Sequence, residues 1–155
     1  MNEYHAALTG LTAYPDELRA LVAHLSEDDA HRVPAPNEWS VVEIIGHLID
    51  IDPLQIERID RILAEERPHF VRFDPDAAVT AAGYGRRTLA DMLTAFTDLR
   101  RATVDGLSTI APDELSRVGV RYTGQEVTLG QLLTSFAAHD QTHAQQIRAI
   151  LTSKG

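Results

Sequence analysis

The chain has 155 residues, 44% hydrophobic and 24% charged, which predicts one soluble globular domain over residues 1–155. Its formal net charge is −9 and Lys and Arg form no basic run, which argues against nucleic acid or an anionic membrane as a partner. No stretch of about 18 apolar residues could span a bilayer, and the absence of cysteine excludes disulfides, thiolate metal ligands and a cysteine nucleophile.

The first predicted helix spans about residues 2–25. Pro15 lies inside it and predicts a kink or a restart, because proline has no N–H for the helical hydrogen bond. Pro34 and Pro36 later break the pattern, so residues 26–39 are predicted to form a connector. The apolar residues of the helix recur every three or four positions and therefore share one face. They are Leu8, Leu11, Leu18, Leu21, Val22 and Leu25.

The second predicted helix begins at a capping box. Ser40 and Glu43 have the spacing at which each side chain accepts a hydrogen bond from the backbone N–H of the other residue. The helical pattern continues to about Glu66. Residues 67–87 contain two prolines and two glycines and have no clear period, so we expect a long connection that crosses over between two helices.

The third predicted helix follows Thr88, whose side chain is placed to cap it. Its apolar face continues to about Ile110 and ends before Pro112. Residues 112–126 form a polar connector to the next helix.

The fourth predicted helix begins at a second capping box, formed by Thr128 and Gln131, and runs to about Thr152. No segment of the chain alternates apolar and polar residues as a half-buried strand does. The predicted fold class is therefore all-α, a four-helix bundle with a long crossover between its second and third helices.

Three histidines interrupt the apolar faces of the second and fourth predicted helices. His139 and His143 are four residues apart, so their Cβ atoms should lie about 5 to 6 Å apart on one inward face. His47 lies on the inward face of the second helix. At 1.5 Å per residue, His47 is about 10 Å from the start of its helix and the pair is about 15 Å from the end of theirs. Antiparallel second and fourth helices would therefore bring the three imidazoles level.

The simpler alternative is that each histidine is buried, neutral and bonded to a backbone carbonyl. Burying three such groups without partners would cost several kcal/mol, whereas one divalent ion would satisfy all three. We therefore predict a metal site made of His47, His139 and His143. Three neutral imidazoles leave at least one open position on the ion, which is typical of catalytic rather than structural sites.

Several motifs resemble those of the DinB-like family, which includes the YfiT-type thiol transferases. They are Trp39-Ser40 at a helix start, His47 within GHLIDID, and His139-Asp140-x-x-His143-x-x-Gln146-Ile147 near the C-terminus. The resemblance spans most of the chain in helix order and connection length. It implies an up-down-down-up bundle, a homodimer, and nickel, zinc or a similar divalent ion on the three histidines.

Two reactions suit such a site. A metal-bound water is acidified towards a pKa of about 7 and would make the protein a hydrolase, whereas a metal-bound thiol is held as thiolate and would make it a transferase. The resemblance favours transfer of a low-molecular-weight thiol, such as bacillithiol or mycothiol, to a small-molecule substrate. A non-catalytic metal-binding or structural dimeric bundle is the alternative, and a pH sensor built from the three imidazoles is a third reading.

Other polar residues near the predicted site have open roles. Asp50 and Asp140 could each orient an imidazole by accepting a hydrogen bond, and Gln146 could do the same. The alternative for each is a solvated position on the helix face.

The segment MNEYHAALTG lacks the basic and apolar regions of a secretory signal, so we expect a cytoplasmic protein. Three arginines could bind an anionic substrate or could be surface residues without such a role. They are Arg86, Arg87 and Arg121.

Overall fold

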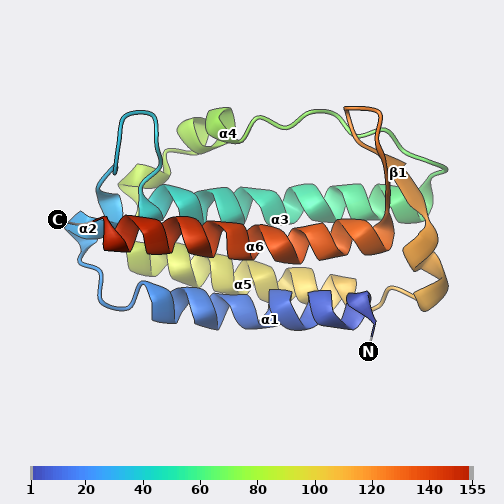
Figure 1. The fold of residues 1–155 in the computed structure, drawn as a ribbon, viewed down its shortest axis with the longest axis horizontal. Coiled ribbons are helices and arrows are strands. Elements are labelled where there is room, and N and C mark those ends of the chain that lie inside the picture. Colours follow the sequence, from blue (N-terminus) through green and yellow to red (C-terminus); the bar gives the residue numbers. More distant parts are fainter. Residues whose placement is uncertain (1, 154–155) are drawn as a thin grey trace.

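Four long helices packed side by side dominate the computed structural model, which describes residues 2–153 (Figure 1). They run up, down, down and up, so the predicted four-helix bundle is confirmed (Figure 1). Each helix packs against two others: α1 and α3 both contact α5 and α6. None of the helices within residues 2–153 has the length and apolar character needed to cross a membrane. The four long helices are α1 (Glu3–Leu21), α3 (Val41–Ala64), α5 (Leu89–Leu107) and α6 (Leu129–Thr152).

Side-chain caps start the helices where the sequence predicts them. The Ser40 hydroxyl accepts from the Glu43 N–H and the Glu43 carboxylate accepts from the Ser40 N–H, at 3.2 and 3.1 Å. Thr128 and Gln131 make the same reciprocal pair at the start of α6. The first helix runs unbroken through Pro15, so it does not restart there.

Short elements occupy the connectors, and the expectation that the chain has no strand was wrong. Strands β1 (Val118–Val120) and β2 (Glu126–Thr128) form an antiparallel hairpin at one end of the bundle (Figure 1). Three residues per strand are too few for alternation to be recognised in the sequence. Gly124 has a φ of 91° in the turn between them, a conformation that glycine adopts readily. The other short elements are α2 (Glu27–His31), α4 (Pro75–Ala82), η1 (Tyr84–Arg86) and η2 (Pro112–Ser116).

The crossover between α3 and α5 runs back along the length of the bundle (Figure 1). It starts by pairing with the hairpin, since the Phe70 N–H donates to the Val120 carbonyl at 2.8 Å. Near its end, the Tyr84 hydroxyl donates to Asp50 of α3 at 2.6 Å. A Cβ atom at Gly46 would overlap the Tyr84 ring, so glycine at this position allows the crossover to lie directly on α3.

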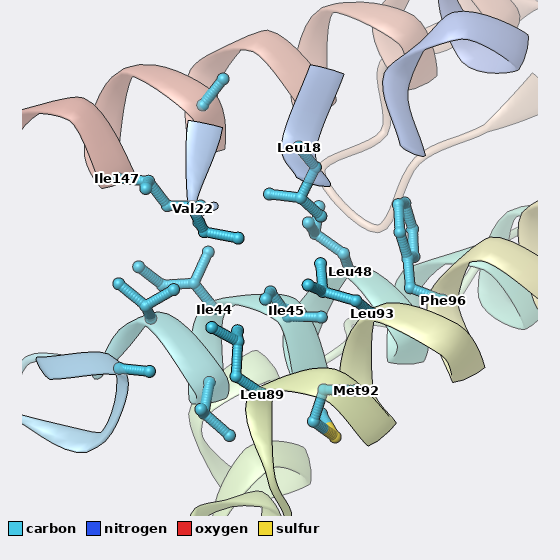
Figure 2. Packing of buried hydrophobic residues seen from close by; sticks show 14 of the residues in the cluster. Leu18, Val22, Ile44, Ile45, Leu48, Leu89, Met92, Leu93, Phe96 and Ile147 are labelled. Carbon is cyan, nitrogen blue, oxygen red and sulfur yellow. The ribbon is translucent and has the colours of Figure 1, made fainter. Parts of the chain in front are cut away.

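The apolar core consists of two clusters, and between them lies a polar layer of buried side chains centred on Asp52, Arg100 and Asp140. One cluster joins the ends of α1, α3, α5 and α6 nearest α2, where side chains such as Ile44, Leu93 and Ile147 interlock (Figure 2). The other joins the opposite ends, nearest the hairpin. On α6 the first cluster begins at Ala144 and the second ends at Ala137, so residues 138–143 lie between them. Both predicted ligands of α6 therefore lie at the level of the polar layer.

Candidate metal centre

The structure brings the three predicted histidines together. His47 of α3 is buried, and the half-buried His139 and His143 lie one turn apart on α6. Nε2 of His139 lies 3.1 Å from Nε2 of His47 and 3.1 Å from Nε2 of His143. One nitrogen from each residue falls within 4.8 Å of the other two. As the axial argument required, α3 and α6 are antiparallel (Figure 1).

These spacings suit a divalent ion. A tetrahedral ion with Zn–N bonds of about 2.1 Å holds its ligand nitrogens about 3.4 Å apart, close to the 3.1 Å found for both adjacent Nε2 pairs. In the absence of a cation, each Nε2 carries either a hydrogen or a lone pair, so the contacts could be N–H···N hydrogen bonds, whereas a cation would be bound by the lone pairs of all three rings. Imidazole is a ligand that zinc, nickel, copper and iron all accept. The three residues present therefore fit a transition-metal ion.

Gln146 orients one of the candidate ligands. Its Oε1 atom lies 2.7 Å from Nδ1 of His143, so this nitrogen carries the hydrogen and Nε2 keeps the lone pair that a metal needs. Nδ1 of His47 and Nδ1 of His139 are buried with no hydrogen-bond partner among the described residues. These two rings are held by packing instead. The centroid of the Trp39 indole, for example, is 4.8 Å from that of the His47 ring.

Asp50 and Asp140, suggested from the sequence as possible hydrogen-bond acceptors for the imidazoles, have other partners in the structure. Asp50 accepts from Tyr84, and Asp140 accepts two hydrogen bonds from Arg100 of α5. One residue along a helix rotates a side chain by about 100°, so Asp140 faces α5 while His139 faces α3. Within residues 2–153, no hydrogen bond joins either carboxylate to a histidine ring.

The site favours neutral imidazoles. Burial, followed by the charge of His143, lowers the pKa of His47 to about 4. Burial and the neighbouring histidines lower the pKa of His139 to about 3, and burial also lowers the pKa of His143. Neutral rings are the form that binds metal, so near pH 7 the three ligands need not first lose a proton.

A cavity of about 430 Å³ lies beside the three rings. It reaches the surface, because Tyr122 in its wall is 63% exposed. Of the three arginines singled out in the sequence, Arg121 lines this cavity and Arg86 and Arg87 do not. Sequence reasoning missed Arg58 and Gln55, although both follow His47 on α3 at spacings that return to a similar side of the helix. Apolar side chains complete much of the wall: Trp39, Ile51, Leu54, Phe70 and Phe73.

A buried ion cluster that the sequence did not predict lies in the same polar layer. Arg100 of α5 donates to Asp52 of α3 and to Asp140 of α6 at 2.7 to 3.0 Å. The same guanidinium donates to the Leu11 carbonyl of α1 at 3.1 Å. This carbonyl lacks a helical partner because Pro15, four residues later, has no N–H. Arg100 thus connects all four long helices next to the candidate ligands.

Comparison with known proteins places these features in a family. The family model of the DinB superfamily matches residues 11–147. A search of curated protein sequences gave no match.

Two solved structures share the fold. One is YfiT from Bacillus subtilis, a probable metal-dependent hydrolase with an unusual four-helix bundle topology. It is 19% identical, with a TM-score of 0.85 over 95% of this chain and 85% of that one. The other is the mycothiol-dependent maleylpyruvate isomerase, 13% identical, with a TM-score of 0.70 over 95% of this chain. The present chain spans 63% of the length of that isomerase.

Proposed function

We propose that this chain, which belongs to the DinB superfamily, is a divalent-metal-dependent enzyme acting on a small molecule. Its three converging imidazoles lie beside an open cavity. The observation that carries the proposal is the pair of 3.1 Å contacts between the Nε2 atoms of His47, His139 and His143. Three ligands leave one side of an ion free, and the cavity gives a small molecule access to that side.

The chemistry of the residues supports a particular class of ion and reaction. An all-imidazole donor set favours zinc or nickel over calcium or magnesium. Such an ion, when bound, supplies an activated water or a stabilised thiolate. The chain has no cysteine, so a thiol would enter as a low-molecular-weight cosubstrate. We propose thiol transfer to a small electrophile, with hydrolysis as the second candidate, because one similar structure is a mycothiol-dependent isomerase and the other a probable hydrolase.

The chain's own residues would prepare the cavity for either reaction. Trp39, Ile51 and Leu54 give the cavity an apolar wall beside the imidazoles. Gln146 holds the His143 ring in the tautomer that presents Nε2. The proposal includes a homodimer, which the family resemblance implies, and a cytoplasmic location, which is a prediction from the sequence.

Metal binding is the first test of the proposal. Metal-free protein is titrated with zinc or nickel while bound metal is measured by elemental analysis. Trp39, the single tryptophan, packs on His47 and reports the titration by its fluorescence. We expect one ion per chain, a loss of tight binding in His143→Ala, and no change in His24→Ala, which alters an exposed histidine. A wild-type chain that takes up no ion would refute the proposal.

Turnover is the second test. The metal-loaded protein is screened with electrophiles in the presence and absence of low-molecular-weight thiols, and separately with esters and amides. Thiol-dependent loss of the electrophile supports transfer, and thiol-independent cleavage supports hydrolysis. Bound metal without any turnover would favour the alternative of a non-catalytic metal-binding bundle.

A further inference from the structure

The cavity beside the histidines has the opposite charge to the protein as a whole. The chain has 23 acidic and 14 basic residues, yet the 13 residues that line the cavity include two arginines and no aspartate or glutamate. With the imidazoles neutral, the only formal charges in the wall are those of Arg58 and Arg121. A positively charged, largely apolar cleft attracts an organic anion more than a cation or a neutral molecule.

Arg58 and Arg121 converge from different parts of the fold. Arg58 lies on α3, is half-buried, and stacks over the Phe70 ring at 5.4 Å, with Nη2 donating to the Val71 carbonyl at 3.2 Å. Arg121 directly follows β1 in the hairpin. Burial, and then the positive charge of Arg121, lower the pKa of Arg58. Both cations lie in the wall of the same cavity of about 430 Å³, where like charges repel each other.

Neither guanidinium forms a salt bridge within the described part of the chain, although the charge of Glu57 acts on Arg58 without pairing with it. Other arginines do: Arg61 pairs with Glu65, Arg67 with Glu126, and Arg100 with two aspartates. Two unpaired cations in a partly desolvated cleft are unfavourable for the empty protein. A ligand carboxylate would relieve this repulsion, since its two oxygens match the paired N–H donors of guanidinium.

We infer that Arg58 and Arg121 form a carboxylate-binding subsite, which holds the anionic end of a small-molecule substrate while its reactive end faces the three histidines. That the bound molecule reacts at the histidines rests on the proposed function. That the bound molecule is an anion rests on the cavity alone.

The position of the subsite on α3 limits the length of the substrate. Arg58 follows His47 by 11 residues, an axial distance of about 16 Å. Side chains of a helix lean towards its N-terminus, so Arg58 leans towards the histidines and the ligand is shorter than this. Between them lie Ile51 and Leu54, and also Gln55, whose Oε1 is buried without a hydrogen-bond partner. The expected substrate has a carboxylate, a short apolar body with one polar group, and an electrophilic or metal-binding end.

Binding of phenylacetate and of its neutral analogue phenylacetamide tests the subsite. Calorimetric or NMR titrations use metal-free protein at pH 7.5 with chelator, where the imidazoles are neutral and no ion can bind the carboxylate. We expect phenylacetate to bind about tenfold more tightly than phenylacetamide, the effect of one charge-assisted pair of hydrogen bonds. Arg58→Gln and Arg121→Gln should each abolish most of this preference, and Arg121→Lys should keep part of it.

Two controls make the result decisive. Arg101→Gln removes the same charge from an exposed position on α5 outside the cavity and should leave the preference intact. Arg58→Gln also removes the hydrogen bond to Val71, so phenylacetamide affinity serves as its folding control, and Arg121→Gln gives an independent answer. Equal wild-type affinities for acid and amide, or an unchanged preference in both glutamine variants, would overturn the subsite.

The outcome is separate from that of the proposed function. The binding assay contains chelator and no metal, so its result does not depend on whether the histidines bind an ion. A protein that prefers the acid but never takes up an ion would refute the enzyme proposal and keep the subsite. A protein that binds an ion but has equal affinities for phenylacetate and phenylacetamide would refute the subsite and keep the enzyme proposal.

Discussion

Asp52 of α3 and Asp140 of α6 are held by the same guanidinium. Arg100 of α5 donates to Asp52 at 3.0 Å through both Nε and Nη2, and to Asp140 at 2.7 and 3.0 Å. All three side chains are at most 1% exposed. Burial raises the pKa of Asp140 to about 6, although the hydrogen bonds from Arg100 act in the opposite direction. Since Asp140 adjoins His139 and Asp52 is five residues from His47, this contact also fixes the relative position of the two helices that carry the histidines.

Removing the positive charge of Arg100 should destabilise the protein strongly. Arg100→Met leaves two buried carboxylates without a partner, and we expect a loss of about 3 to 5 kcal/mol in the free energy of unfolding, measured with urea at pH 7.5. Adding Asp52→Asn and Asp140→Asn to Arg100→Met should recover part of the loss. The deficit should shrink at pH 5, where Asp140 takes up a proton more easily. An Arg100→Met protein as stable as the wild type would contradict this account.

The contact between Gly46 and Tyr84 gives a second prediction. Alanine is normally favoured over glycine inside a helix by about 1 kcal/mol, but a Cβ at position 46 would overlap the Tyr84 ring. We expect Gly46→Ala to destabilise the protein by about 1 to 3 kcal/mol in urea unfolding, as overpacking does. In a Tyr84→Ala background the same change should become neutral or stabilising. A destabilisation of equal size in both backgrounds would show that the ring is not the cause.

Much of the fold was predictable because the signals are local. Apolar residues at helical spacing define the four long helices, and the boxes at Ser40 and Thr128 mark two of their starts. The candidate ligands were predictable for the same reason: His47, His139 and His143 occupy apolar faces, and helix order determines whether they meet.

The features that sequence reasoning missed depend on contacts between distant segments. Asp140 is one residue from a candidate ligand, yet its partner is Arg100, 40 residues away. Arg58 and Arg121 share a cavity only because the hairpin folds back over α3, and no local pattern predicts strands of three residues. Pro15 reads as a helix breaker, but Arg100 supplies the hydrogen bond that the Leu11 carbonyl lacks.

Gln146 gives a third prediction, about metal affinity. Its hydrogen bond to Nδ1 of His143 fixes the tautomer and the ring orientation, and loss of such a partner typically weakens metal binding about 10- to 100-fold. Gln146→Ala should therefore raise the zinc dissociation constant by about this factor in a competition assay with a chelating dye. Gln145→Ala, which changes an exposed neighbour, is the matched control. Equal affinities in the two variants would remove Gln146 from the site.

The histidines and Asp140 have opposite effects on how stability changes with pH. The pKa values of His47 and His139 fall from 6.5 to about 4 and about 3 on folding. The unfolded chain therefore binds protons that the folded protein does not. The contribution of these two histidines to the free energy of unfolding is complete above pH 6.5 and is lost as the pH falls towards 4. Asp140 rises from 3.8 to about 6, so its contribution is complete below pH 3.8 and lost as the pH rises. Asp50 and His31, whose pKa values are also raised, act in the same direction as Asp140. The lowered pKa values of His47 and His139 are the larger shifts, so the histidines determine the sign.

The metal-free protein should therefore become more stable as the pH rises from 4.5 to 6.5. Each net proton bound only by the unfolded chain contributes about 1.4 kcal/mol per pH unit, and the lowered pKa of His143 acts in the same direction. Urea unfolding in the presence of chelator measures the slope. His139→Gln removes one titrating group and should reduce it, whereas His24→Gln, at an exposed position, should not. A slope that is flat, or that survives His139→Gln unchanged, would mean that protonation of the buried imidazoles does not limit folding.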